Sequence, residues 1–188
     1  MPTTALLVID MLSTYDHEDA DVLAESAAAA VPEIRALLDR AGEDTLVVYI
    51  NDNFEAWEAS REQLLEQALK GKRPDLIEPI APGADMPFLA KGRHSVFYQT
   101  ALDHLLRARD IERLVMTGQA TEQCILYSAL DAYLRGFQIV IPTDAVAHID
   151  DELAEAAIEM MRRNMSAEIV RAEACDLVGA GSPTSTQS

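Results

Sequence analysis

The sequence predicts a single α/β domain, a three-layer αβα sandwich in which a mainly parallel sheet lies between two layers of helices. Two observations predict this fold class. Short, uninterrupted apolar runs of strand length alternate along the chain with segments whose apolar residues recur at helical spacing. The connections between successive apolar runs are long enough for the right-handed crossovers that join parallel strands.

The first part of the chain is expected to alternate strand, helix and strand. Residues 5–9 and 45–50 are apolar runs bounded by polar residues, as in strands that are buried on both faces of a parallel sheet. Between them, residues 21–40 keep one apolar stripe at helical spacing. We expect a helix there, either continuous or beginning anew at Pro32.

The middle of the chain combines a helix with a long irregular connection. Residues 59–70 have a helix-like pattern and follow a polar turn at residues 51–53. Four of the eight prolines lie in residues 71–92, so this stretch is expected to be mostly loop, with a short helical turn at residues 76–80. The apolar residues 86–90 indicate a short third strand.

The second half continues the alternation. Helices are expected at residues 102–109, 121–134 and 152–164, and strands at residues 113–117, 137–141 and 167–170. We expect one domain over residues 1–178 and a disordered tail over residues 179–188, which has no apolar side chain larger than alanine. In such open parallel sheets, ligands bind outside the carboxyl ends of the strands, so function should be sought there.

Composition excludes some classes of partner. The 32 acidic and 15 basic side chains give a formal net charge of -17, which repels phosphate groups and anionic lipids. We therefore expect neither nucleic acid nor membrane as a partner. The first apolar run is broken at once by Asp10 and follows no basic stretch, which fits neither a signal peptide nor a spanning helix. A cytoplasmic protein is expected, with Cys124 and Cys175 as free thiols.

Two charged residues are expected near the carboxyl ends of strands. Asp10 directly follows the first apolar run and is either a general base or a residue that turns the chain. Lys91 follows the predicted third strand, which would carry it to the same edge of the sheet, although a lone lysine is usually solvated. From the residues alone, both alternatives stay open for each side chain.

Cys124 is the candidate nucleophile. It lies in or near the first turn of the helix that follows strand 113–117, where unpaired N–H groups and the helix dipole favour a thiolate and could hold an oxyanion. Alternatively, it is a small buried residue that packs the helix on the sheet. Cys175 lies beside acidic residues that would raise its pKa, so we expect it to be structural.

Three aromatic residues follow the first two strands, and they are Tyr15, Phe54 and Trp57. They either form the walls of a substrate pocket at the carboxyl edge, or cover the core or a subunit interface. Both interpretations have equal weight at this point.

Three sequence patterns together resemble one known family. They are Asp10 after a buried first strand, Lys91 in Lys-x-x-x-Ser-x-Phe, and Gly118-x-x-Thr121-x-x-Cys124 followed by Ala132 and Gly136. In this order, and over nearly the whole chain, they resemble the isochorismatase-like cysteine hydrolases, which include nicotinamidases and N-carbamoylsarcosine amidohydrolases. The resemblance implies an isochorismatase-like, Rossmann-like fold.

The resemblance also implies a catalytic triad. Asp10 would take the thiol proton, and Lys91 would keep the charged groups in position. Cys124 would attack a carbonyl carbon to form a thioester, which water then hydrolyses. In the family, a cis peptide bond precedes the nucleophile, and here it would join Gln119 to Ala120. The N–H groups of Ala120 and Cys124 would then point at the oxyanion.

The sequence departs from some members of that family. In the family that this chain resembles, nicotinamidases that bind a metal have an Asp-x-His pattern after the second strand. Here Asp52 is followed by Asn53 and Phe54, so we expect no metal and no cofactor. The histidines show no ligand spacing and are expected at the surface or hydrogen-bonded, and they are His17, His94, His104 and His148. True isochorismatases, which cleave a vinyl ether, lack the cysteine at the nucleophile position.

The resemblance therefore implies a metal-independent hydrolase that cleaves a C–N bond in a small amide, carbamoyl or ureido compound, as a homo-oligomer (dimer or tetramer). Two alternatives stay open. One is hydrolysis of an ester or isochorismate-type ether on the same fold, and the other is a non-catalytic small-molecule binder. The sequence does not name the substrate, because loops such as residues 51–57 would set the specificity.

Overall fold

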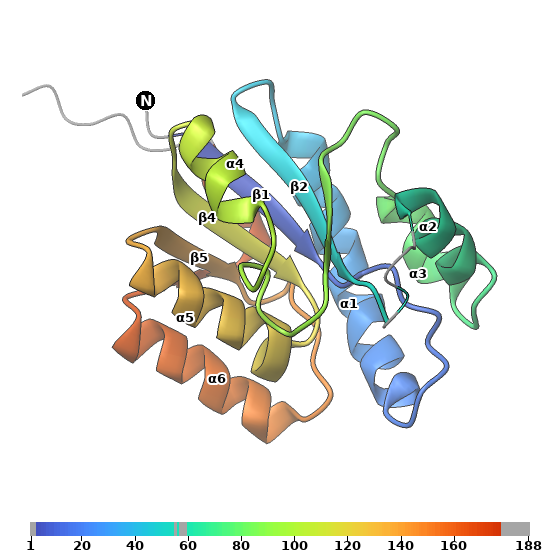
Figure 1. Cartoon of the computed structure of the whole chain (residues 1–188). Coiled ribbons are helices and arrows are strands. Elements are labelled where there is room, and N and C mark those ends of the chain that lie inside the picture. The colour runs from blue at the N-terminus through green and yellow to red at the C-terminus, as the bar shows by residue number, and fades with distance from the viewer. Residues whose placement is uncertain (1–2, 55, 57–59, 178–188) are drawn as a thin grey trace, which may run out of the picture.

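The computed structural model describes residues 3–54, 56 and 60–177 and contains one sheet (Figure 1). In these residues, six strands pair in the order β3-β2-β1-β4-β5-β6, and every pairing is parallel. The strands are β1 Thr3–Ile9, β2 Thr45–Asp52, β3 Phe88–Lys91, β4 Ile111–Gly118, β5 Gln138–Pro142 and β6 Glu168–Val170. The parallel sheet was predicted from the alternation of apolar runs and helical stripes.

Helices cover both faces of the sheet. They are α1 Ala20–Arg40, α2 Arg61–Leu69, α3 Pro74–Ile77, α4 Leu102–Ala108, α5 Leu126–Leu134 and α6 Asp151–Asn164, with short turns η1 Glu78–Ile80, η2 Thr121–Ile125 and η3 Ala172–Ala174. One hydrophobic core joins the sheet to α1, α2 and α3, and the other joins it to α4, α5 and α6. The two layers lie on opposite sides of the strands (Figure 1). The predicted three-layer α/β fold is confirmed.

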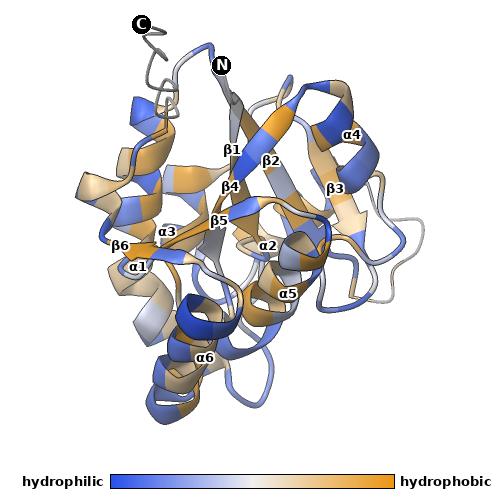
Figure 2. Ribbon diagram, turned by 90° about the vertical axis from the view of Figure 1, so that its left-hand side faces the viewer, coloured by the Kyte–Doolittle hydropathy of each residue, from blue (hydrophilic) through white to orange (hydrophobic). Residues whose placement is uncertain are grey.

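The central strand β1 contributes to both cores. Leu6 and Val8 belong to the core under α1, whereas Leu7 and Ile9 belong to the core under α4 and α5. Successive side chains of a strand point to opposite faces, so a strand covered on both faces must be apolar throughout. The outer helices instead carry both hydrophobic and hydrophilic residues, as α6 does in Figure 2. No helix in the described part of the chain is long and apolar enough to cross a membrane.

Two elements differ from the sequence prediction. Helix α1 is continuous with Pro32 inside it, so a new start at Pro32 is wrong. Val31 and Ile34, on either side of the proline, are both buried, and this packing offsets the loss of one N–H donor. The helix predicted over residues 121–134 begins with one π-helical turn, in which Ile125 N donates to the carbonyl of Ala120 at 3.1 Å.

The chain order reverses between β1 and β4, which places a crevice at the carboxyl ends of these two strands. The two strands meet closely at Gly118, which has a φ of 110°. A Cβ atom at this position would lie 2.0 Å from the carbonyl oxygen of Ile9. Gln119 N then donates to the same oxygen at 3.0 Å. The segment that leads to Cys124 is thereby held against the end of β1, next to Asp10.

Candidate active site

The three residues of the predicted triad meet at this edge of the sheet. Asp10 follows β1, Lys91 ends β3, and Cys124 lies in η2 after β4. Lys91 Nζ is 2.7 Å from Asp10 Oδ2 and 3.5 Å from Cys124 Sγ. Lys91 is 1% exposed, and Asp10 and Cys124 are less than a tenth exposed. One ammonium group therefore contacts both a carboxylate and a thiol in a nearly buried cluster.

The charges of Asp10 and Lys91 stabilise each other. Burial raises the pKa of Asp10, and the charge of Lys91 and hydrogen bonds from Cys124, Lys91 and the backbone of Asp52 oppose that rise. For Lys91, burial lowers the pKa, but the negative charges of Asp10, Cys124 and Asp52 outweigh it and leave the pKa above its ordinary value. Lys91 is therefore a cation near neutral pH, and Asp10 keeps a pKa above its ordinary value, which suits a group that accepts a proton.

The Cys124 thiol keeps its proton in the resting site. Burial raises its pKa, the charge of Asp10 raises it further, and Lys91 opposes both only in part. The start of a helix was expected to favour a thiolate, and burial together with the charge of Asp10 acts in the opposite direction. A reaction at this sulfur needs a base to remove the proton, and Asp10 is hydrogen-bonded to it.

Asp52 also belongs to the cluster, although the sequence analysis considered it only for a metal motif. Its Oδ2 atom lies 3.4 Å from Lys91 Nζ, and its backbone N donates to Asp10 Oδ1 at 2.7 Å. The signal was available in the sequence. Asp52 ends a strand parallel to β1, so its carboxylate comes to the same edge as that of Asp10.

The peptide bond between Gln119 and Ala120 is cis. The Gln119 side chain is buried and links three parts of the site. Its Nε2 donates to the carbonyl oxygen of Asp10 at 2.8 Å, and its Oε1 accepts from the Tyr15 hydroxyl at 3.0 Å. Gln119 therefore ties the end of β1 to the segment that carries Cys124.

A cavity of about 380 Å³ opens onto the cluster. Its described lining, which we call the active-site cavity, is Asp10, Ser13, His17, Asp19, Leu23, Asp52, Phe54, His94, Gln119, Ala120, Gln123, Cys124 and Ile149. Phe54, an expected pocket residue, is among them and is more than half exposed. The volume of the cavity suits a small molecule, and Cys124 is part of its lining.

The other two aromatic residues of the prediction lie elsewhere. Tyr15 is 1% exposed and does not line the cavity, so its expected place in the pocket wall needs correction. Burial raises the pKa of Tyr15 to about 12, and its hydroxyl donates a hydrogen bond to the Gln119 side chain. Trp57 lies outside the described residues. The burial of Tyr15 depends on the chain folding back under α1, which hydrophobic periodicity does not encode.

His94 is a site residue that the sequence analysis missed. It is exposed, as expected, but its Nδ1 lies 3.7 Å from Cys124 Sγ and its ring packs on Tyr127 with centroids 5.4 Å apart. The neighbouring Val96 N donates to Ser128 Oγ at 3.0 Å, which fixes this loop to α5. His148 is hydrogen-bonded, as one alternative for it predicted, through Ser26.

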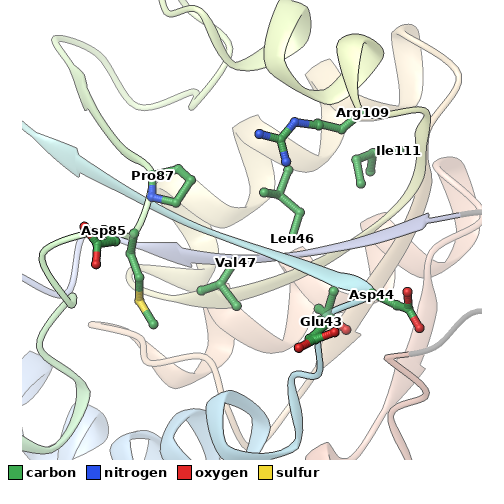
Figure 3. A pocket seen from close by; sticks show the side chains of 10 residues that line it. Glu43, Asp44, Leu46, Val47, Asp85, Pro87, Arg109 and Ile111 are labelled. Carbon is green, nitrogen blue, oxygen red and sulfur yellow. The ribbon is translucent and has the colours of Figure 1, made fainter.

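No group of three or more His, Cys, Asp and Glu side chains that could hold a metal occurs in the described residues. A second cavity, of about 420 Å³, lies at the opposite, amino edge of the sheet. It is lined by the start of β2 and β4 together with Asp85 and Arg109, and Figure 3 shows these side chains around it. Its described lining contains no thiol, in contrast to that of the active-site cavity.

Comparison with known proteins places this chain in a family. The family model described as the isochorismatase domain matches residues 4–174. The chain belongs to the isochorismatase family. Membership of the isochorismatase family was predicted from the three patterns around Asp10, Lys91 and Cys124, and the match covers all of them. It also covers nearly all of the strands and helices described above.

Relatives in the isochorismatase family include enzymes with named reactions. An uncharacterised family protein of Bacillus subtilis, YaaI, is 35% identical over 90% of this chain and 94% of its own. A maleamate amidohydrolase of Pseudomonas putida is 29% identical, covering 81% of this chain and 76% of its own. The solved structure of an N-carbamoylsarcosine amidase from Thermoplasma acidophilum has a TM-score of 0.71 at 27% identity and covers 93% of this chain and 99% of its own.

Proposed function

We propose that this protein is a cysteine amidohydrolase that cleaves the C–N bond of a small amide, carbamoyl or ureido compound. The observation that carries the proposal is the position of Lys91 Nζ, 2.7 Å from the Asp10 carboxylate and 3.5 Å from the Cys124 sulfur, beneath a cavity of small-molecule size. The amidohydrolases among the relatives support the choice of a C–N bond. The catalytic roles below are part of the proposal.

In the first half of the reaction, the Asp10 carboxylate removes the proton from Cys124 Sγ while the sulfur attacks the carbonyl carbon of the substrate. Lys91 stays protonated and stabilises the developing thiolate. This is needed because burial raises the pKa of the Cys124 thiol. The N–H groups of Ala120 and Cys124 hold the oxyanion. The C–N bond then breaks, the departing nitrogen takes the proton from Asp10, and ammonia or an amine leaves a thioester on Cys124.

In the second half, water attacks the thioester carbon and loses a proton to Asp10. The C–S bond breaks, and the Cys124 thiolate takes this proton back, which restores the resting site and releases the acid. Proton transfer by a positioned carboxylate typically contributes 10² to 10⁴ in rate, roughly 3–5 kcal/mol. Asp10 is suited to both transfers because burial raises its pKa while the charge of Lys91 favours its ionised form.

Further properties belong to the proposal. The family match over residues 4–174 supports a single domain over residues 1–178, and the sequence Asp52-Asn53-Phe54 supports a reaction without metal or cofactor. The net charge of -17 supports a small-molecule substrate rather than nucleic acid or membrane as the partner. We also propose a cytoplasmic homo-oligomer, a dimer or tetramer.

The test is ammonia release from a panel of small primary amides, carbamoyl compounds and ureido compounds. Cys124→Ala is expected to abolish release, and Cys175→Ala, which removes the other cysteine, is the matched control with wild-type turnover. Acid formed from esters without activity on amides would favour the ester hydrolase. Absence of turnover together with an alkylation rate of Cys124 no faster than that of Cys175 would favour a non-catalytic binder.

A further inference from the structure

The active-site cavity has a one-sided charge. Three of its described lining residues are carboxylic acids, Asp10, Asp19 and Asp52, and none of the described ones is a lysine or arginine. The lining also includes two histidines, His17 and His94. Positions 55 and 57–59, which follow Phe54 in the sequence, contain no basic residue. A lysine or arginine charge near a bound substrate would therefore have to come from a residue outside this described lining.

Lys91 supplies that positive charge, but two neighbouring carboxylates already compensate it. Its ammonium group lies 2.7 Å from Asp10 Oδ2 and 3.4 Å from Asp52 Oδ2, and it is 1% exposed. The cavity lining therefore has three carboxylic acids, two of which lie next to the one ammonium group. Arg93, next to His94 in sequence, lines a different hollow together with Asn53 and Tyr98.

The α1 helix offers only a partial counter-charge. Asp19 is the N-cap residue of α1, and its side chain makes no capping hydrogen bond. A helix N-terminus corresponds to about half a positive charge, which is smaller than the full negative charge of the Asp19 carboxylate. The potential inside the cavity is therefore negative. A cleft lined by one sign of charge changes the local concentration of a charged ligand by about 10- to 1000-fold.

We infer that the substrate carries no carboxylate and is an uncharged or cationic amide. This inference rests on the proposed function and narrows its substrate class. It separates this chain from relatives named for maleamate and N-carbamoylsarcosine, both of which are carboxylates. An anionic substrate would enter against Asp19 and Asp52 without a guanidinium or ammonium group in the described lining to pair with it.

The experiment compares two alkylating reagents of nearly the same size, neutral iodoacetamide and anionic iodoacetate, on the wild-type protein. The rate at Cys124 is followed by peptide mass spectrometry at pH 8.5, and each rate is divided by that for 2-mercaptoethanol. We expect iodoacetamide to be favoured at least tenfold, with a smaller preference at high salt.

Two charge variants locate the effect. Asp19→Lys should reduce the preference severalfold, because it replaces a lining carboxylate by an ammonium group. Asp44→Lys makes the same change in net charge at the amino edge of the sheet, in the cavity of Figure 3, and should leave the preference unchanged. A general effect of the net charge of -17 would make the two variants equal.

Each outcome is decisive. Equal corrected rates for the two reagents, or the same response in Asp19→Lys and Asp44→Lys, would overturn the inference while ammonia release from a neutral amide still supports the amidohydrolase. Faster reaction of iodoacetate would overturn it too and point to a carboxylate-binding site. No alkylation of Cys124 in the folded protein, when the urea-denatured protein is alkylated, would refute the nucleophile itself and the inference with it.

Discussion

A buried ion pair lies next to a thiol at the carboxyl edge of the sheet. Asp10 and Lys91 lie at the ends of strands that are far apart in sequence, and the charge of each favours the charged form of the other. The sequence indicated both residues and Cys124 because each follows a recognisable apolar run. It did not indicate His94 or the burial of Tyr15, because a contact between two loops leaves no periodic pattern.

Replacement of Asp10 by asparagine tests the base. Asp10→Asn keeps the shape of the side chain but removes the proton acceptor, so kcat/KM for ammonia release should fall by about 10³. The charge of Asp10 is one cause of the raised pKa of Cys124. In the variant this pKa should therefore be lower, and the rise of iodoacetamide labelling with pH should shift to lower pH. Turnover near the wild-type value would contradict the role of Asp10.

Asp52→Asn tests the second carboxylate. Asp52 lies 3.4 Å from Lys91 Nζ and is one of the charges that raise the pKa of Lys91. Its loss should lower kcat/KM about tenfold, or about 1.4 kcal/mol in transition-state stabilisation, with the fold retained. Asp85→Asn, in the cavity at the amino edge, is the matched control. If Asp52→Asn and Asp85→Asn had the same kcat/KM, the Asp52 carboxylate would have no role in the reaction.

The elements were predicted more completely than the site. The buried strands and the long helices follow from periodicity, and even β3 was expected from five apolar residues in a proline-rich stretch. The π-helical turn η2 was not, because its hydrogen bond to the carbonyl of Ala120 depends on how this segment lies on β1. Thr121 N also donates to the carbonyl of Ala147, from a loop 26 residues later, at 2.8 Å. Such tertiary constraints are absent from local sequence.

The junction of β1 and β4 gives a prediction of its own. Gly118→Ala should destabilise the protein strongly, by about 3 kcal/mol or more, because φ is 110° and the new Cβ would lie 2.0 Å from the Ile9 carbonyl oxygen. Urea unfolding followed by circular dichroism measures this loss. Gly42→Ala is the control, since a Cβ at that position would have no described atom within 4 Å, and it should be neutral or slightly stabilising. Equal midpoints would contradict the close approach of the two strands.

Several buried groups make the stability of the whole molecule sensitive to alkaline pH. Burial raises the pKa of Tyr15 and of Tyr49 to about 12, and it also raises the pKa of Cys124 and Cys175. In the unfolded chain these groups ionise at their ordinary pKa values, near 10 for tyrosine and 9 for cysteine. The unfolded state then binds fewer protons than the folded state. Stability from these groups is complete below pH 9 and declines as the pH rises toward 12.

Tyr49→Phe isolates one of these groups away from the active-site cavity. Tyr49 is 3% exposed and its hydroxyl donates to the Ile80 carbonyl at 2.9 Å, so the variant should lose about 1 kcal/mol of unfolding free energy at pH 7.5. Between about pH 8 and pH 11, however, it should lose about 1.4 kcal/mol less than the wild type, because the phenol that ionises on unfolding is gone. Urea unfolding of the variant and the wild type at pH 7.5, pH 8 and pH 11 measures both effects. If the variant and the wild type lost the same free energy over this interval, the buried Tyr49 hydroxyl would not be a source of the alkaline instability, which would then have to come from Tyr15 and the two thiols.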